Sequence, residues 1–187
     1  MSRTRGNHPD FRNGWYSGAR CVPSPNYDFR PDVDDISVIV IHAISLPPDT
    51  FGGDFVESFF CNELEPSAHP YFGEIRELQV SAHFYIKRSG ELLQFVSGNH
   101  RGWHAGQSRF DGRTAVNDFS IGIELEGCDT VDFESVQYDV LATLVTALRV
   151  EYPKIDSDRI VGHSDIAPGR KTDPGPHFDW DRLRSLF

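Results

Sequence analysis

The sequence lacks the features that would place the chain in a membrane or in a disulfide framework. Its 187 residues contain no apolar run near the roughly 18 residues that cross a bilayer. The cysteines Cys21, Cys61 and Cys128 are odd in number and form no C-x-x-C pair, which indicates free thiols in a reducing cytosol. Residues 1–10 have no apolar core, so they do not form a signal peptide. We therefore expect a cytoplasmic protein.

Positive charge is also scarce. The chain has 18 Lys and Arg residues against 28 Asp and Glu residues, and its formal net charge is −10 at pH 7. Nucleic acids and anionic membrane surfaces bind proteins through basic patches, so we expect neither as a partner. Hydrophobic residues make up 39% of the chain and charged residues 25%, which is typical of a soluble globular protein.

Hydrophobic patterns predict a sheet and one long helix. Residues 37–42 contain four consecutive β-branched apolar residues, which predicts a central strand buried on both faces, with His42 at its C-terminal end. Alternation predicts further strands over 80–87 and 119–126, and 91–96 completes a hairpin. Apolar residues recur every four positions from about 134 to 152, which predicts a helix. A short strand over 158–162 is expected to lead into His163, and a last helix to lie within 178–187.

These elements predict an α/β fold: a single domain over residues 14–187, with a central mixed β-sheet flanked by helices. Residues 1–13 are polar and are expected to form a flexible N-terminal extension. Residues 45–79 are irregular, with one short helix expected between Phe55 and Leu64. A connection this long inside a compact domain is usually functional, so we expect it to form a wall or lid over a site.

A proline-rich stretch from His163 to Pro176 combines an imidazole, a lysine and a carboxylate. Asp173 precedes a proline, which favours extended backbone, so Lys171 and Asp173 should face one cavity while Arg170 and Thr172 face away. Alternatively, the stretch is a surface loop with solvated charges. Lys171 would then be an ordinary surface lysine, whereas beside a metal ion it would stabilise an oxyanion.

Three residues form a candidate metal site. A catalytic zinc ion uses three protein ligands, commonly His and Asp or Glu, and leaves one position for water. His42 and His163 lie at predicted strand ends, and Asp173 follows ten residues later. Alternatively, His42 is a packed core histidine. Glu124 lies in a strand of Ile, Gly and Leu, where a buried carboxylate needs a partner or a function. Glu126 on the same face keeps open the alternative of a solvent-exposed edge strand.

Seven motifs together resemble the zinc-dependent N-acetylmuramoyl-L-alanine amidase family, which is related to peptidoglycan-recognition proteins. The resemblance runs from about Gly14 to Trp180 and includes the cytoplasmic amidases that act on 1,6-anhydro-muropeptides. The motifs are Val22-Pro-Ser-Pro25, His42 with Ile44-Ser-Leu-Pro-Pro48, Phe51-Gly-Gly53, Val80-Ser-Ala-His83, Trp103-His-Ala-Gly106, Asn117-Asp-Phe-Ser-Ile-Gly-Ile-Glu-Leu-Glu-Gly127 and Lys171-Thr-Asp-Pro-Gly175.

The resemblance implies residue roles. It places the zinc ligands at His42, His163 and Asp173, the catalytic glutamate at Glu124 and the catalytic lysine at Lys171. Substrate contacts are expected from Trp103 stacking on the sugar, Asn117 binding the stem peptide and His83 as a wall of the pocket. The remaining histidines are expected to be surface or loop residues: His69, His100, His104 and His177.

The implied reaction is hydrolysis of the amide between N-acetylmuramic acid, preferably in its 1,6-anhydro form, and L-alanine. A monomer acting on a small soluble muropeptide in cytoplasmic peptidoglycan recycling is expected. One alternative is an amidase of the intact cell wall. Another is a non-catalytic recognition protein, but such proteins usually lack one of the three metal ligands. A metal-dependent phosphoesterase is less favoured, because binding phosphate would need a cluster of Arg and Lys residues. Ala43 departs from the family, which has an asparagine there that would hydrogen-bond substrate, so substrate affinity or preference is expected to differ.

Overall fold

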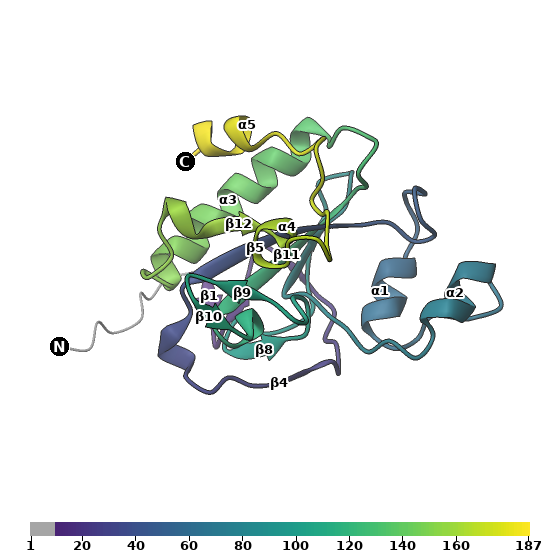
Figure 1. Ribbon diagram of the computed structural model, residues 1–187, viewed down its shortest axis with the longest axis horizontal. Helices are drawn as coiled ribbons and strands as arrows, with labels where there is room; N and C mark the ends of the chain where they lie inside the picture. The colour runs from purple at the N-terminus through teal and green to yellow at the C-terminus, as the bar shows by residue number, and fades with distance from the viewer. Residues whose placement is uncertain (1–9) are drawn as a thin grey trace.

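The computed structural model describes residues 10–187, and a mixed six-stranded sheet forms the centre of that part (Figure 1). Strands β12, β5, β11 and β6 are parallel neighbours in this order, β7 is antiparallel to β6, and β3 is parallel to β7. The expected α/β fold with a central mixed sheet is confirmed. The strands are β3 (Arg20–Cys21), β5 (Val38–Ile44), β6 (Phe84–Ile86), β7 (Leu92–Gln94), β11 (Ser120–Glu126) and β12 (Ile160–Gly162).

Short ladders and helices surround this sheet. The ladders pair β1 (Phe11–Arg12) with β2 (Trp15–Tyr16), β4 (Tyr27–Phe29) with β8 (His100–Gly102), and β9 (Arg109–Phe110) with β10 (Arg113–Thr114). The helices are α1 (Phe55–Phe60), α2 (Pro70–Ile75), α3 (Ser135–Glu151), α4 (His163–Ile166) and α5 (Trp180–Ser185). The 3₁₀ turns are η1 (Val33–Asp35), η2 (Val116–Asp118) and η3 (Ser157–Arg159).

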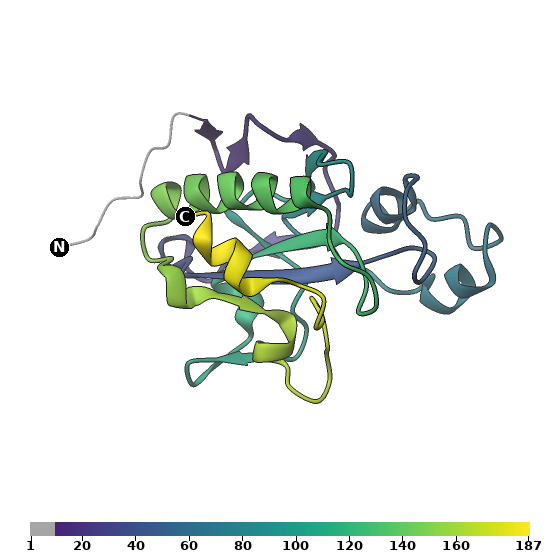
Figure 2. The same cartoon turned by 90° about the horizontal axis from the view of Figure 1, so that it is seen from above.

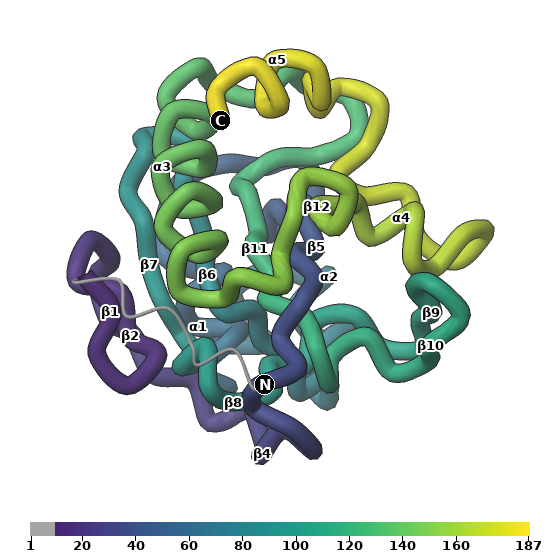
Figure 3. The backbone as a smooth tube through the Cα atoms, turned by 90° about the vertical axis from the view of Figure 1, so that its left-hand side faces the viewer, coloured from purple at the N-terminus to yellow at the C-terminus, as the bar shows by residue number. Residues whose placement is uncertain are grey.

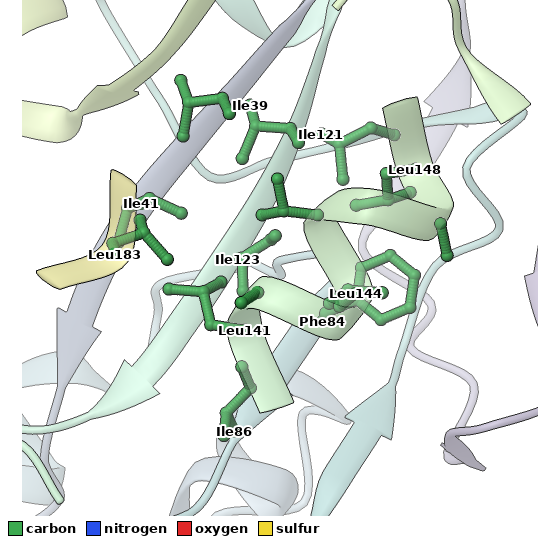
Figure 4. Packing of buried hydrophobic residues seen from close by; sticks show 14 of the residues in the cluster. Ile39, Ile41, Phe84, Ile86, Ile121, Ile123, Leu141, Leu144, Leu148 and Leu183 are labelled. Carbon is green, nitrogen blue, oxygen red and sulfur yellow. The ribbon is translucent and has the colours of Figure 1, made fainter. Parts of the chain in front are cut away.

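Helix α3 covers one face of the sheet (Figure 4). Alternate residues of β5 and β11, such as Ile39 and Ile123, point to this face and are fully buried. They meet the apolar stripe of α3, which includes Leu141, Leu144 and Leu148. The four-residue spacing of this stripe keeps the side chains on one side of a 3.6-residue helix, so the expected helix is confirmed.

The opposite face of the sheet carries the polar residues. Near the amino end of β5, Val38 and Val40 lie on this face and pack with Ile166 of α4. Figure 3 shows α3 and α4 on opposite sides of β5 and β11. Further along the same face, the residue that follows Val40 in the alternation is His42. Strands β5 and β11 therefore present an apolar face toward α3 and a face toward α4 that becomes polar near the carboxyl ends of the strands.

Residues 45–79 leave the sheet and return to it (Figure 2). Helices α1 and α2 lie together beyond the carboxyl end of β5. They have a hydrophobic cluster of their own, in which Phe60 and Phe72 pack with Tyr85 and Phe95. The helix expected between Phe55 and Leu64 is confirmed as α1. Helix α2 was not predicted from the sequence. Pro70 occupies its first turn, and the His69 side chain accepts the Tyr71 N–H.

Glu126 shows that β11 is not an edge strand. The strand lies between β5 and β6, and the Glu126 side chain is 4% exposed. Its carboxylate accepts hydrogen bonds from the backbone N–H groups of Gly52 and Arg88, the latter at 2.8 Å. The alternative of a solvent-exposed edge strand is therefore wrong. Glu126 instead ties the 45–79 excursion to the β6–β7 hairpin.

Packed structure begins closer to the N-terminus than expected. Residues 1–9 of the expected 1–13 extension lie outside the described residues. Phe11 is 7% exposed, belongs to the main core cluster and lies with its ring centroid 5.0 Å from that of Tyr16. Packed structure therefore reaches at least to Phe11, because an aromatic side chain closes this end of the core.

Candidate metal centre and catalytic cavity

Three adjacent strands bring the candidate residues to one level of the sheet. Glu124 of β11 is the direct register partner of His42 of β5. On the other side of β5, Gly162 pairs with Ile41, and His163 follows immediately as the first residue of α4. Directly opposed residues of parallel strands project to the same side. The carboxyl end of an open α/β sheet, where ligands usually bind, thus carries all three side chains.

His42, His163 and Asp173 converge on one point. The Nδ1 atoms of His42 and His163 are 2.9 Å apart. Asp173 Oδ2 lies 3.1 Å from His42 Nδ1 and 3.0 Å from His163 Nδ1. The Ser164 N–H donates to the Asp173 carbonyl at 2.9 Å, so the loop after α4 is held against the helix. The residues expected to form a metal site are therefore together.

This donor set fits a divalent metal ion. Ligand atoms about 2.0–2.1 Å from a tetrahedral Zn²⁺ lie about 3.3 Å from each other, close to the separations found. Burial lowers the pKa of His42 to about 4, so the ring is neutral at pH 7 and retains a nitrogen lone pair. Burial pushes the pKa of Asp173 upward, but hydrogen bonding to His163 and His42 holds it below its ordinary value. Two imidazoles and a carboxylate, all aimed at one point, can thus hold a metal.

Glu124 enters the same cavity, which has a volume of about 360 Å³. Its Oε2 atom is buried and has no hydrogen-bond partner among residues 10–187. Burial raises the pKa of Glu124 well above its ordinary value; the Asp173 carboxylate adds to this rise, and Lys171 opposes it. A carboxyl group that holds a proton this readily, close to a metal site, is suited to accept and return a proton. Lys171 and Asp173 both line the cavity, as expected from their spacing.

The 45–79 excursion forms an apolar wall of the cavity, which confirms the expected wall. Trp103 and Ala43 also line the cavity. An apolar wall opposite a cluster of titratable groups is typical of a small-molecule site. The nonpolar and aromatic wall residues from the excursion are Leu46, Pro48, Phe59, Phe60, Tyr71, Ile75 and Leu78, and Ser45 adds a hydroxyl group.

Two expected substrate contacts, His83 and Asn117, are not among the residues that line the cavity. His83 is fully buried, its Nδ1 accepts the Gly122 N–H at 3.0 Å, and its Nε2 lies 3.0 Å from the His100 carbonyl. The prediction of His83 as a pocket wall is wrong, because its side chain is fully buried and is not among those that line the cavity. The Oδ1 atom of Asn117 accepts the backbone N–H of Ala105 at 2.8 Å, so this side chain holds a loop.

One histidine that was expected to be a surface or loop residue lines the site. His104 lines the cavity, with its Nδ1 2.9 Å from His42 Nε2. Arg170, which was expected to face away, is not among the residues that line the cavity, and it donates to the carbonyl groups of Ala105 and Gln107 at 2.7 Å each. Gly122 of β11 makes room for the His104 ring. A Cβ atom on Gly122 would lie 2.4 Å from the His104 ring, so the missing side chain leaves room for the imidazole.

Comparison with known proteins relates this site to one enzyme family. Residues 32–176 match the family described as N-acetylmuramoyl-L-alanine amidase. The 1,6-anhydro-N-acetylmuramyl-L-alanine amidase AmpD of Citrobacter freundii is 53% identical over 173 residues, which cover 92% of each chain. A crystal structure of a Se-Met AmpD derivative superposes with a TM-score of 0.91 at 52% identity, over 94% of this chain and 98% of that one.

A more distant relative has been solved with a ligand. It is the N-acetylmuramyl-L-alanine amidase AmiD of Escherichia coli, in complex with anhydro-N-acetylmuramic acid-L-Ala-D-γ-Glu-L-Lys. It superposes with a TM-score of 0.59 at 30% identity, over 81% of this chain and 57% of that one. Within residues 10–187, no helix has the length and apolar character needed to cross a bilayer.

Proposed function

Because the chain belongs to the N-acetylmuramoyl-L-alanine amidase family, we propose that it hydrolyses the amide between N-acetylmuramic acid and the L-alanine of muropeptides. We further propose a preference for the 1,6-anhydro sugar, a role in peptidoglycan recycling and Zn²⁺ as the metal. The observation that carries the proposal is that a metal-ligand triad, Glu124 and Lys171 share one cavity. A non-catalytic recognition protein would not need the last two residues.

The reaction divides between the metal and the side chains around it. When held by His42, His163 and Asp173, Zn²⁺ supplies polarisation of the scissile carbonyl and a lowered pKa for the attacking water. Glu124 accepts the proton of that water and later returns it to the leaving amine of L-alanine. Its raised pKa favours the protonated state, so Glu124 holds the proton between these two steps.

Lys171 and the cavity wall position the substrate. Lys171 lines the cavity, where its ammonium group would stabilise the negative charge that develops on the carbonyl oxygen. Trp103 and the apolar residues from the 45–79 excursion offer a surface for the sugar ring and its lactyl group. Asn117 holds the backbone of His104 and Ala105, next to Trp103, and its contact with the stem peptide stays a prediction.

The proposed substrate class is tested by comparing a soluble anhydro-muropeptide with intact cell-wall sacculi. Mass spectrometry should show release of anhydro-N-acetylmuramic acid and free peptide from the soluble substrate, at a much higher rate than peptide release from sacculi. Equal or faster cleavage of sacculi would indicate a wall-degrading amidase. The cytoplasmic location and the monomeric state expected from the sequence stay predictions, which cell fractionation and light scattering can check.

Replacing Lys171 with methionine is expected to lower kcat by about 10²-fold, the effect of losing one oxyanion donor. The oxyanion exists only after water attacks, so KM should change little and zinc content should not change. Steady-state kinetics on anhydro-muropeptide and elemental analysis measure these quantities. The matched control is Lys154→Met, because Lys154 is an exposed lysine paired with Asp35 outside the cavity. An increase in KM with constant kcat would instead make Lys171 a substrate-binding residue.

Replacing Ala43 with asparagine should strengthen substrate binding. Ala43 lines the cavity directly after the ligand His42, and its methyl side chain offers no hydrogen bond. One added hydrogen bond to substrate is expected to lower KM by about 2- to 10-fold, with kcat nearly constant. The same kinetic assay measures this change. A KM that stays constant or rises would show that the amide does not reach the substrate.

A further inference from the structure

The two nitrogens of the His42 ring have different surroundings. Nδ1 faces His163 and Asp173, whereas Nε2 lies on the opposite side of the ring, 2.9 Å from Nδ1 of His104. A nitrogen that binds a metal carries no proton, so a neutral His42 with Nδ1 on the metal carries its proton on Nε2. That proton is then donated to His104 Nδ1. His104 is thus the hydrogen-bond acceptor that this ligand requires.

The His104 ring is held in the orientation that this hydrogen bond needs. With Nδ1 accepting, its own proton resides on Nε2, which lies 3.2 Å from the Ser120 hydroxyl oxygen. The ring packs over Gly122, where a Cβ atom would approach its Cγ, Nδ1 and Cδ2 to 2.4–2.7 Å. It meets the His42 ring edge to face, with centroids 5.0 Å apart and planes at 83°. Little rotation is left to it.

The next residue of the same loop serves the other histidine ligand. The carbonyl of Ala105 lies 3.1 Å from His163 Nε2 and accepts its N–H, which leaves His163 Nδ1 unprotonated toward the metal point. The Asn117 side chain accepts the backbone N–H groups of both His104 and Ala105. His104 and Ala105 therefore orient both imidazole ligands, the first through its side chain and the second through its backbone carbonyl.

We propose that His104 is a positioning residue of the metal centre, which fixes the tautomer and the rotation of His42 through the His42 Nε2–H to His104 Nδ1 hydrogen bond. The proposal rests on the metal site of the proposed function. Outer hydrogen-bond partners of metal-binding histidines typically change metal affinity by about 10- to 100-fold when removed. His104 acts on the metal through His42, and its effect should appear in metal binding before any substrate is added.

The test is Zn²⁺ affinity, measured by competition with a chromophoric chelator on the full chain. His104→Phe keeps a ring of similar size but removes the acceptor, so its zinc affinity should fall by about 10- to 100-fold. His104→Asn places a carboxamide oxygen near the former Nδ1 position, so it should recover most of that loss. The visible absorption of bound Co²⁺ should shift in His104→Phe and stay close to wild type in His104→Asn.

One control variant and one replacement variant complete the test. His177→Ala removes an exposed histidine that pairs with Asp132, and its zinc affinity should equal that of wild type. If His104→Phe does not fold, as judged by circular dichroism, His104→Ala replaces it, because alanine also lacks the acceptor and leaves free space.

The outcomes separate this proposal from the proposed function. Wild-type zinc affinity in an acceptor-less variant, or an asparagine variant as weak as phenylalanine, overturns the role of His104. A wild-type chain that binds no zinc overturns the metal site itself. A chain that binds zinc but cleaves no muropeptide overturns only the proposed reaction.

Discussion

Replacing Glu124 with alanine is expected to lower kcat by about 10²- to 10⁴-fold while the fold and the bound zinc are retained. Glu124 is the register partner of a metal ligand but contributes no atom to the ligand triad. Its removal therefore deletes proton transfer and leaves the metal donors in place. The measurements are single-turnover rates on anhydro-muropeptide and zinc content by elemental analysis.

A glutamine at position 124 provides the matched control. Glu124→Gln preserves the size of the side chain and can donate a hydrogen bond, but it cannot accept the proton of the attacking water. It should be as slow as the alanine variant, within about tenfold, if proton transfer is the role of Glu124. Turnover close to wild type in either variant, with zinc bound, would show that another group acts as the base.

Replacing His163 with alanine should abolish both zinc binding and activity. Wild type is expected to hold about one zinc ion per chain, because one donor triad of the required type lies in the described part of the chain. The variant retains only His42 and Asp173, and two protein ligands rarely hold a catalytic zinc ion. Elemental analysis after dialysis measures this directly. Full occupancy in His163→Ala would remove His163 from the ligand set.

Thermal unfolding gives an independent check of the same ligand. A metal that binds only the folded state raises the melting temperature, so a chelator should lower the melting temperature of wild type. The same chelator should leave His163→Ala unchanged, because no metal stabilises it. His177→Ala, which alters an exposed histidine, should respond like wild type. A chelator effect of equal size in His163→Ala would mean that zinc binds without this histidine.

Local sequence patterns were sufficient for the elements whose environment is uniform. Four consecutive β-branched residues required burial on both faces, and residues 38–41 are fully buried in the middle of the sheet. The stripe of Leu144 and Leu148 required an apolar partner, and α3 covers one face of the sheet. The ligand triad followed from chemistry that few residue types provide, together with a motif shared with a known family.

Other features depended on distant parts of the chain. Alternation in residues 80–87 indicated two sides but not that both would be buried, and His83 was assigned to the pocket for that reason. Only residues 84–86 of this segment are in a strand. His104 gave no local signal of its own, because its role depends on the absent side chain at Gly122 and on the position of His42.

The residues that carry out the reaction and the residues that select the substrate belong to different parts of the fold. His42 and Glu124 are opposed on hydrogen-bonded strands, whose spacing of about 4.8 Å is a property of the sheet. The apolar wall belongs to the 45–79 excursion, whose two helices lie beyond the strand ends (Figure 2). Insertions or deletions in this excursion can therefore change the size of the accepted molecule without altering the distance between the reacting groups. Substrate range can diverge during evolution through one loop, while the hydrolytic chemistry is inherited unchanged.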